Sequence, residues 1–115
     1  MPPCLFCEII AGKIPSHAVF EDTSVKAFLD IHPNALGHTL IVPKYHSENV
    51  LAAPSDDVLA MISVAKRVVA VTEKILGAQG CRLQFNVGAH AGQTILHTHL
   101  HVIPAFAPET MASVG

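Results

Sequence analysis

Three histidines occupy alternate positions in the segment HTHLHVIP, which runs from His97 to Pro104. Residues two apart in a β-strand point to the same face, so His97, His99 and His101 are expected to line one face of a strand. The first and third Cα atoms would be roughly 13 Å apart, too far to share one metal ion easily, whereas neighbours roughly 6.6 Å apart can share one. At least one imidazole is therefore left to act as acid, base or nucleophile near neutral pH.

A polar stretch interrupted by glycines leads into this segment and contains Asn86, Gly88, Gly92, Gln93 and Thr94. Such stretches let backbone amides approach an anion, and the side-chain amides add neutral donors. Beside three histidines on one face, this composition favours phosphate chemistry. The alternative is an ordinary hairpin loop.

A C-x-x-C pair, Cys4 and Cys7, lies near the N-terminus. In a reducing compartment such a pair indicates metal or redox use rather than a structural disulfide. The third cysteine, Cys81, is expected to be a small buried hydrophobic residue.

The length of 115 residues fits one domain, spanning residues 1–115, and is small enough that obligate dimerisation is plausible. Seven lysines and arginines stand against nine acidic residues, so no basic field indicates a nucleic-acid or membrane partner. The chain shows neither a secretory leader nor an apolar run of the roughly 18 residues that a membrane span needs. We therefore expect a cytoplasmic protein.

The elements that must position these residues follow from hydrophobic periodicity and turn signals. Strands are expected at residues 15–22, 24–30, 37–44, 81–88 and 93–104. Short helices are expected within residues 2–13, ended by Gly12, and within residues 46–54. Because the strands are grouped before and after one long helix, the pattern predicts an α+β fold with an antiparallel sheet of about five strands.

The long helix carries the clearest signals. Ser55 is expected as its N-cap, Asp56 and Asp57 lie in the first turn, Lys74 lies in the last, and Gly77 follows the end. Its apolar stripe, expected to cover one face of the sheet, comprises Val58, Met61, Ile62, Ala65, Val68, Val69, Thr72, Ile75 and Leu76.

The segment GQTILHTHLHVIP resembles the motif of the histidine triad (HIT) superfamily. CLFCEIIAGKIPSHAVFED, AFLDIHPNALGHTLIVPKYH and NVGAHAGQTILHTHLHVIP are similar in order and spacing to small HIT proteins of the nucleoside phosphoramidase (Hint-like) branch and their bacterial relatives. The resemblance covers residues 4–104. The tail, residues 105–115, departs from the branch because it lacks the tryptophan of members whose C-terminal segment shapes the substrate pocket.

The resemblance implies a mechanism. His99 would attack the α-phosphorus and form a nucleotidyl-histidine, which water then hydrolyses. For this, the far ring nitrogen must be unprotonated, which a hydrogen bond from the other N–H to a backbone carbonyl would secure. His101 and Gln93 would donate to the nonbridging phosphate oxygens, Thr94 would lie near the leaving group, and Asn86 would hold the phosphate from the side.

The same resemblance assigns the nucleoside. Asp30 would accept hydrogen bonds from the ribose hydroxyls, although an aspartate at a strand end is as often a turn former. An apolar slot for the base is expected from Phe6, Ile9, Phe28, Leu29 and Ile31. Of the other histidines, His38 is expected to make a structural hydrogen bond, and His17, His32 and His90 to lie in loops or at the surface.

The resemblance also gives the first histidine a task. Cys4, Cys7, His46 and His97 would hold a structural Zn²⁺ in a closed tetrahedral site, as in similar bacterial members. Other members lack the cysteines and use the matching histidines in a hydrogen-bond chain. Unmetallated thiols and a redox pair are the remaining alternatives for the C-x-x-C pair.

Two classes of function remain open. The first is a hydrolase or nucleotidyl transferase that acts on purine nucleoside phosphoramidates, adenylated compounds or dinucleoside polyphosphates. The second is a noncatalytic zinc- or nucleotide-binding module. The related hexose-1-phosphate uridylyltransferases carry glutamine at the position of His101, so histidine there favours hydrolysis. We also expect a homodimer whose long helices pack together and whose sheets join into one.

Overall fold

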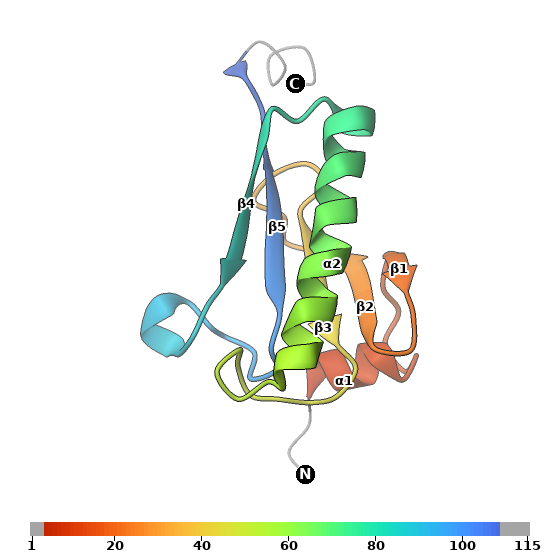
Figure 1. Ribbon diagram of the computed structural model, residues 1–115, viewed down its shortest axis with the longest axis vertical. Helices are drawn as coiled ribbons and strands as arrows, with labels where there is room; N and C mark the ends of the chain where they lie inside the picture. The colour runs from red at the N-terminus through yellow and green to blue at the C-terminus, as the bar shows by residue number, and fades with distance from the viewer. Residues whose placement is uncertain (1–3, 109–115) are drawn as a thin grey trace.

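A computed structural model describes residues 4–108 of the chain. Five antiparallel strands form one sheet in the order β1-β2-β3-β5-β4 (Figure 1). The strands are β1 (Ala18–Glu21), β2 (Val25–Leu29), β3 (Thr39–Pro43), β4 (Gly80–Phe85) and β5 (Leu100–Ala105). The predicted α+β class with a five-stranded antiparallel sheet is confirmed. The predicted positions 2, 3 and 109–115 lie outside the described residues.

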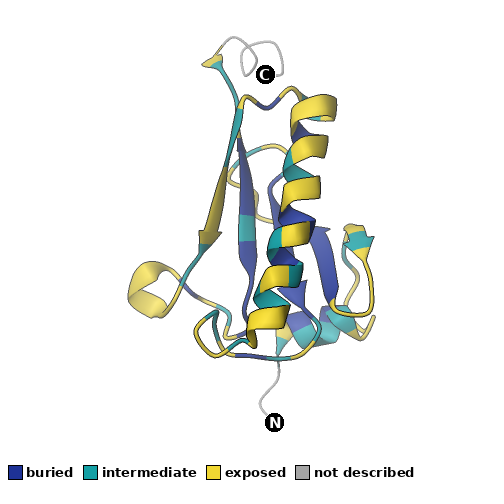
Figure 2. Cartoon of the chain, in the orientation of Figure 1, coloured by how far each residue is buried: buried dark blue, intermediate teal, exposed yellow. Residues whose placement is uncertain are grey.

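The two faces of the sheet are covered by different helices. Helix α2 (Ser55–Val71), continued by the π-helical segment η1 (Thr72–Leu76), lies across one face, and the short helix α1 (Leu5–Ile10) packs on the other (Figure 1). Side chains alternate along the central strands, so Ile41 packs toward α2 while Leu40 and Val42 pack toward α1. The central strands β2, β3 and β5 are buried, whereas β4 and the outer side of α2 are exposed (Figure 2).

Alternation in β5 decides where the third histidine points. Leu100 and Val102 belong to the core beneath α2. His101, between them, therefore projects to the face that α1 covers. This face of the sheet holds the candidate site.

The long helix is confirmed with two corrections. Ser55 is its first residue, and Pro54 occupies the N-cap position without a side-chain bond. Ile75, predicted in the core, is 70% exposed, because the wider turn of η1 shifts the angular positions of the residues that follow α2. Gly77 ends the helix in the left-handed conformation, as predicted. None of the helices within residues 4–108 is long and apolar enough to cross a membrane.

The predicted short helix within residues 46–54 is wrong, because the chain forms only a turn there. The carbonyl of Asn49 accepts from the N–H groups of Ala52 and Ala53, and its side-chain oxygen accepts from the N–H of Leu51. A local side-chain bond of this kind competes with helix formation.

The last strand begins later than predicted, at Leu100 instead of position 93. The ladder between β3 and β5 ends at the pair Ile41 and Leu100. Two residues beyond Ile41 stands Pro43, which has no N–H to donate to a further rung. Of the three histidines only His101 lies in a strand, while His97 and His99 lie in the bent segment before it.

Candidate active site and metal centre

A pocket of about 360 Å³ opens on the α1 side of the sheet. The predicted residues that line it are Phe6, Ile9, Phe28, Leu29, Asp30, Ile31, Thr94, His99 and His101. Sequence reasoning missed Leu5, Ile14, Pro15, Ser16, His32, Leu40 and Ile95. Most of the wall is apolar, and the histidines, the carboxylate and the hydroxyl provide polar groups, which is the usual composition of a small-molecule site.

His99 is buried, and its orientation is set by the main chain. Its Nδ1 lies 2.7 Å from the carbonyl oxygen of His97. A carbonyl can only accept, so Nδ1 carries the proton and the Nε2 of a neutral ring keeps its lone pair. Burial lowers the pKa of His99, against the opposing effects of the His97 carbonyl and Asp30. The ring therefore suits a nucleophile in its predicted tautomer.

His101 belongs to a second chain of hydrogen bonds, which fixes the opposite tautomer. The N–H of Asn34 donates to Nδ1 of His38 at 3.0 Å, so a neutral His38 carries its proton on Nε2. That Nε2 lies 3.0 Å from Nδ1 of His101 and donates to it. His101 is thereby left with a proton on Nε2, available to a ligand. His38 thus makes its predicted hydrogen bond, but to a pocket residue.

Both histidines of this chain are held neutral. Burial lowers the pKa of His38, although Asp30 opposes the shift. Burial lowers the pKa of His101 to about 4, with contributions from His99 and His38 and again against Asp30. At neutral pH, His101 is therefore a neutral hydrogen-bond donor.

Asp30 forms the predicted turn and also lines the pocket. One carboxylate oxygen accepts from the N–H of His32 at 2.9 Å, which is the turn-forming bond of the structural alternative. The other oxygen lies 3.6 Å from Nε2 of His38. Since Asp30 also lines the pocket, its carboxylate is within reach of a ligand there. His17, His32 and His90 are exposed, as predicted, but His32 stands at the rim of the pocket.

Gln93 and Asn86 are not among the residues that line the pocket. Both N–H groups of the buried Gln93 amide are used, because Nε2 donates to the carbonyls of Glu48 and Ile95 at 2.7 and 3.0 Å. Its side-chain oxygen accepts from the N–H of Gly88. These bonds make Gln93 fasten the loop before the histidines, and its donation to a phosphate stays a prediction.

Asn86 lies in the same loop, which turns through left-handed glycines at positions 88 and 92. Its side-chain oxygen accepts from Nε2 of Gln84 at 2.9 Å. Its Nδ2 lies 3.5 Å from the position that a Cβ at residue 92 would take. Asn86 thus lies beside the loop backbone and does not line the pocket.

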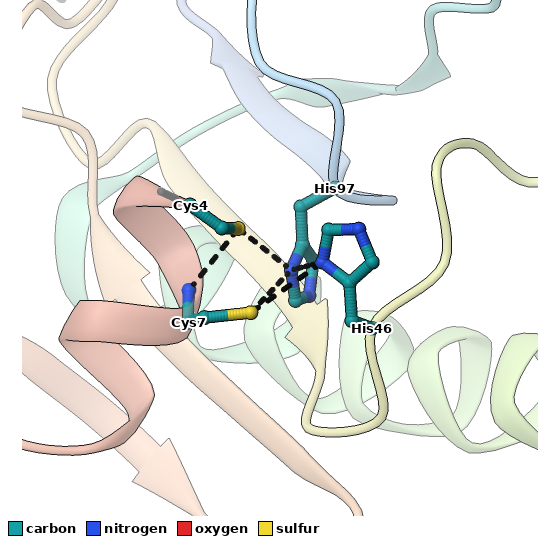
Figure 3. Close-up of side chains that lie close together, drawn as sticks. All are labelled: Cys4, Cys7, His46 and His97. Carbon is teal, nitrogen blue, oxygen red and sulfur yellow. Dashed lines mark hydrogen bonds between the residues drawn. The ribbon is translucent and has the colours of Figure 1, made fainter. Parts of the chain in front are cut away.

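Four residues from three distant segments converge next to the pocket (Figure 3). Cys4 caps the N-terminus of α1 and Cys7 lies within it, His46 follows β3, and His97 precedes β5. Nδ1 of His97 lies 3.3 Å from Sγ of Cys4, 3.5 Å from Sγ of Cys7 and 3.1 Å from Nδ1 of His46. Sγ of Cys7 lies 3.4 Å from Nδ1 of His46.

These separations are close to the edges of a tetrahedron around a zinc ion. For typical Zn–S and Zn–N bonds the S···N edges are about 3.5 Å and the N···N edge is about 3.3 Å. Nε2 of the buried His97 donates to the carbonyl of Pro43 at 2.9 Å, which leaves Nδ1 free to bind a metal. The donor set and its spacing therefore fit a structural zinc ion.

The protonation of these groups bears on the alternatives. Burial raises the pKa of the Cys7 thiol to about 11, with contributions from Cys4 and Glu8. A raised pKa makes the metal-free Cys7 thiol a weak nucleophile. A bound cation would remove this obstacle, because a coordinated thiol is deprotonated.

Two polar residues that sequence reasoning passed over hold the histidine segment in place. The hydroxyls of Ser47 and Thr98 lie 2.6 Å apart, and the N–H of Thr98 donates to the carbonyl of Ser47 at 2.8 Å. Ser47 and Thr98 are buried neighbours of His46 and His97 in the sequence. These bonds fasten together the two segments that carry the metal-facing imidazoles.

Comparisons with known proteins agree with this arrangement. The family model described as HIT domain matches residues 11–107. An uncharacterised HIT-like protein of Methanocaldococcus jannaschii is 46% identical over 103 residues, which are 90% of this chain and 79% of that protein. An Arabidopsis thaliana protein named adenylylsulfatase HINT3 is 40% identical over 101 residues, 88% of this chain and 51% of that protein.

A solved structure gives the same result. The zinc-bound histidine triad family protein of Mycobacterium smegmatis superposes with a TM-score of 0.88 at 36% identity, over 92% of this chain and 77% of that one. The family match covers most of the chain, and the superposition shows that the fold is the same. The chain therefore belongs to the HIT domain family.

Proposed function

We propose that the protein is a nucleotide hydrolase that cleaves the bond between the α-phosphorus and the leaving group of purine nucleoside phosphoramidates or other adenylated compounds. Membership of the HIT family supports nucleotide binding and hydrolysis in general. The observation that carries the finer proposal is the hydrogen bond from His99 Nδ1 to the His97 carbonyl, which leaves Nε2 of His99 unprotonated beside a pocket.

In the proposed first step, Nε2 of His99 attacks the α-phosphorus, and the bond from phosphorus to the leaving group breaks. The leaving nitrogen takes up a proton from solvent and departs as the amine, near the hydroxyl of Thr94. The Nε2–H of His101 donates to a nonbridging oxygen, where negative charge gathers in the transition state. The rings of His99 and His101 have centroids 4.9 Å apart, so both can contact one phosphoryl group.

In the second step, water attacks the phosphorus of the nucleotidyl-histidine and the P–N bond to His99 breaks. The nucleoside monophosphate leaves, one proton of the attacking water passes to solvent, and His99 returns to its neutral form. Throughout, Asp30 would accept from the ribose hydroxyls, while Phe6, Ile9 and Phe28 would enclose the base.

We also propose that Cys4, Cys7, His46 and His97 hold a structural zinc ion. Four protein ligands close the coordination shell, so zinc would stabilise the fold next to the pocket without taking a substrate. The zinc-bound relative and the spacing of the four ligand atoms support this assignment. A cytoplasmic location remains a prediction.

Purified protein should release AMP from adenosine 5′-phosphoramidate, measured by separating the nucleotides chromatographically. Adenylyl sulfate and a diadenosine polyphosphate in parallel reactions identify the preferred leaving group. The His99→Ala variant is the control for a contaminating activity. If the protein binds AMP but hydrolyses none of the three compounds, it is a noncatalytic nucleotide-binding module instead.

A further inference from the structure

We propose that the metal centre and the nucleotide pocket are coupled through α1, so that zinc tightens nucleotide binding and the nucleotide tightens zinc binding. The inference rests on the proposed function, because it takes AMP as a ligand of the pocket. It adds a regulatory property to that site: the affinity of the enzyme for nucleotides follows its metal content.

Helix α1 contributes to both sites. Cys4 is its N-cap residue and Cys7 lies one turn later, so both thiols belong to this one element. Leu5, Phe6 and Ile9, interleaved with the cysteines, line the pocket. Because α1 has only six residues, it is too short to be stable without contacts to the rest of the protein.

Phe6 makes the contact between the two sites. Its side chain is 2% exposed, and its ring stands edge-on to the rings of both His97 and His99, with centroids 5.8 and 5.0 Å away. His97 faces the metal centre and His99 faces the pocket. A shift of α1 that separates the thiols from His97 therefore also moves Phe6 off His99 and opens the pocket wall.

The two ends of α1 are held differently. At its C-terminal end, the buried Lys26 donates from Nζ to the carbonyl of Ile9 at 3.3 Å. At its N-terminal end, the contacts of Cys4 and Cys7 with the two histidines join the helix to the segments after β3 and before β5. A metal ion would strengthen this second attachment. Zinc thus favours the seated position of α1, which is also the position that encloses a base.

Linkage gives a test with two independent readouts, neither of which is catalytic activity. We expect the dissociation constant for AMP, measured by calorimetry, to be about tenfold higher in chelator-treated protein than in zinc-loaded protein. The dissociation constant for zinc, measured against a chromophoric competing chelator, should fall by the same factor when AMP is saturating, because coupling is reciprocal.

Variants locate the coupling. Phe6→Leu keeps an apolar side chain but removes the ring, and should still bind zinc while the zinc effect on AMP falls to within about twofold. Cys81→Ser, which alters a cysteine outside both sites, should keep the full coupling. Circular dichroism shows whether the metal-free chain stays folded. If it unfolds, the Cys4→Ser variant takes the place of the chelator-treated protein in the comparison, since its three remaining ligands bind zinc only weakly.

The outcomes separate this inference from the proposed function. Equal AMP affinity with and without zinc overturns the coupling and leaves the proposed function intact. Unchanged coupling in Phe6→Leu overturns the route through α1. Failure of both forms to bind AMP overturns the proposed function together with the inference.

Discussion

The Nδ1 atom of His99 lies 2.7 Å from the backbone carbonyl of His97, so the first histidine of the motif orients the second with its main chain. The ring of His97 is engaged elsewhere, between the carbonyl of Pro43 and the cysteines of α1. His101 pairs with His38. Each of the three imidazoles thus has a different partner, and only His99 keeps a lone pair directed away from the protein groups that bind it.

Replacing His99 by alanine should abolish turnover by several orders of magnitude while AMP binding survives. The substitution removes the nucleophile, whereas the pocket wall and the other donors remain. AMP release measures turnover and calorimetry measures binding. In the unchanged protein, rapid acid quenching followed by mass spectrometry should detect a nucleotidyl adduct on the peptide that carries His99. Near-normal turnover in the alanine variant would show that another group is the nucleophile.

Replacing His101 by alanine should reduce kcat by about 10²- to 10³-fold, the effect expected from losing one donor to a developing oxyanion. His38→Leu should reduce kcat less. It leaves His101 in place but removes the hydrogen bond that keeps the proton of His101 on Nε2. His38→Gln, whose amide N–H can still donate to His101, should recover part of the loss. If the leucine and glutamine variants behave alike, the hydrogen bond between His38 and His101 has no part in catalysis.

The stability of the fold should fall as the pH decreases below 6.5. Burial lowers the pKa of His101 from 6.5 to about 4 in the folded chain, so in this window the unfolded chain binds a proton that the folded chain does not. Stability contributed by the neutral form is therefore complete above pH 6.5 and is lost as the pH falls toward about 4. Thermal unfolding across this range measures the loss. His101→Gln should show a shallower decline, and parallel curves for the two proteins would exclude this contribution.

Local patterns predicted most of the fold, but they misplaced the start of the last strand. The alternation of histidine with other residues continues back to His97, so periodicity alone extends the strand backward. The strand begins only at Leu100 because Pro43 cannot donate to the preceding rung and because Thr98 bonds to Ser47 instead. Both causes involve residues more than fifty positions away, which periodicity cannot register.

The residues of the candidate site could be predicted where a family motif includes them. They could not be predicted where only tertiary contacts bring a residue to the site. Asp30, Thr94, His99 and His101 line one pocket, as the resemblance implies. The sequence gives no sign of the bond from Gln93 to the carbonyl of Glu48, because the two residues are 45 positions apart. The pocket residues Ile14, Pro15 and Ser16 were missed because they belong to a loop, and an ordinary loop sequence gives no sign that it lines a pocket.

We predict a homodimer in which two α2 helices pack together and two sheets join along β4. Of the two edge strands, β1 contains an irregular register between Ala18 and Phe20, which disfavours further pairing, whereas β4 is regular over six residues. Leu83 of β4 is paired with Val102, so its side chain lies on the face of the sheet that α2 covers, yet it is 47% exposed. Leu59 of α2 is 67% exposed. A second copy would bury these side chains.

Sedimentation velocity should therefore give the mass of a dimer. Leu83→Lys should raise its dissociation constant by about tenfold or more, which corresponds to about 1.4 kcal/mol. Leu51→Lys is the matched control, because Leu51 is 82% exposed in a turn that belongs to neither element. A monomer mass that does not change with concentration in the unaltered protein would exclude the dimer.

Protein purified without chelator should contain about one zinc ion per chain, held at distances near 2.3 Å to sulfur and 2.0 to 2.1 Å to nitrogen. The reason is the closeness of four ligand atoms from α1, His46 and His97, whose Nδ1 is kept free by the bond from Nε2 to Pro43. Cys7→Ser should lose most of the metal and lower the midpoint of thermal unfolding, since zinc joins three distant segments of the chain. Cys81→Ser should retain one zinc per chain. Elemental analysis of the three proteins measures the metal, and a Cys7→Ser variant with normal zinc content would return His97 to the hydrogen-bond chain of the alternative interpretation.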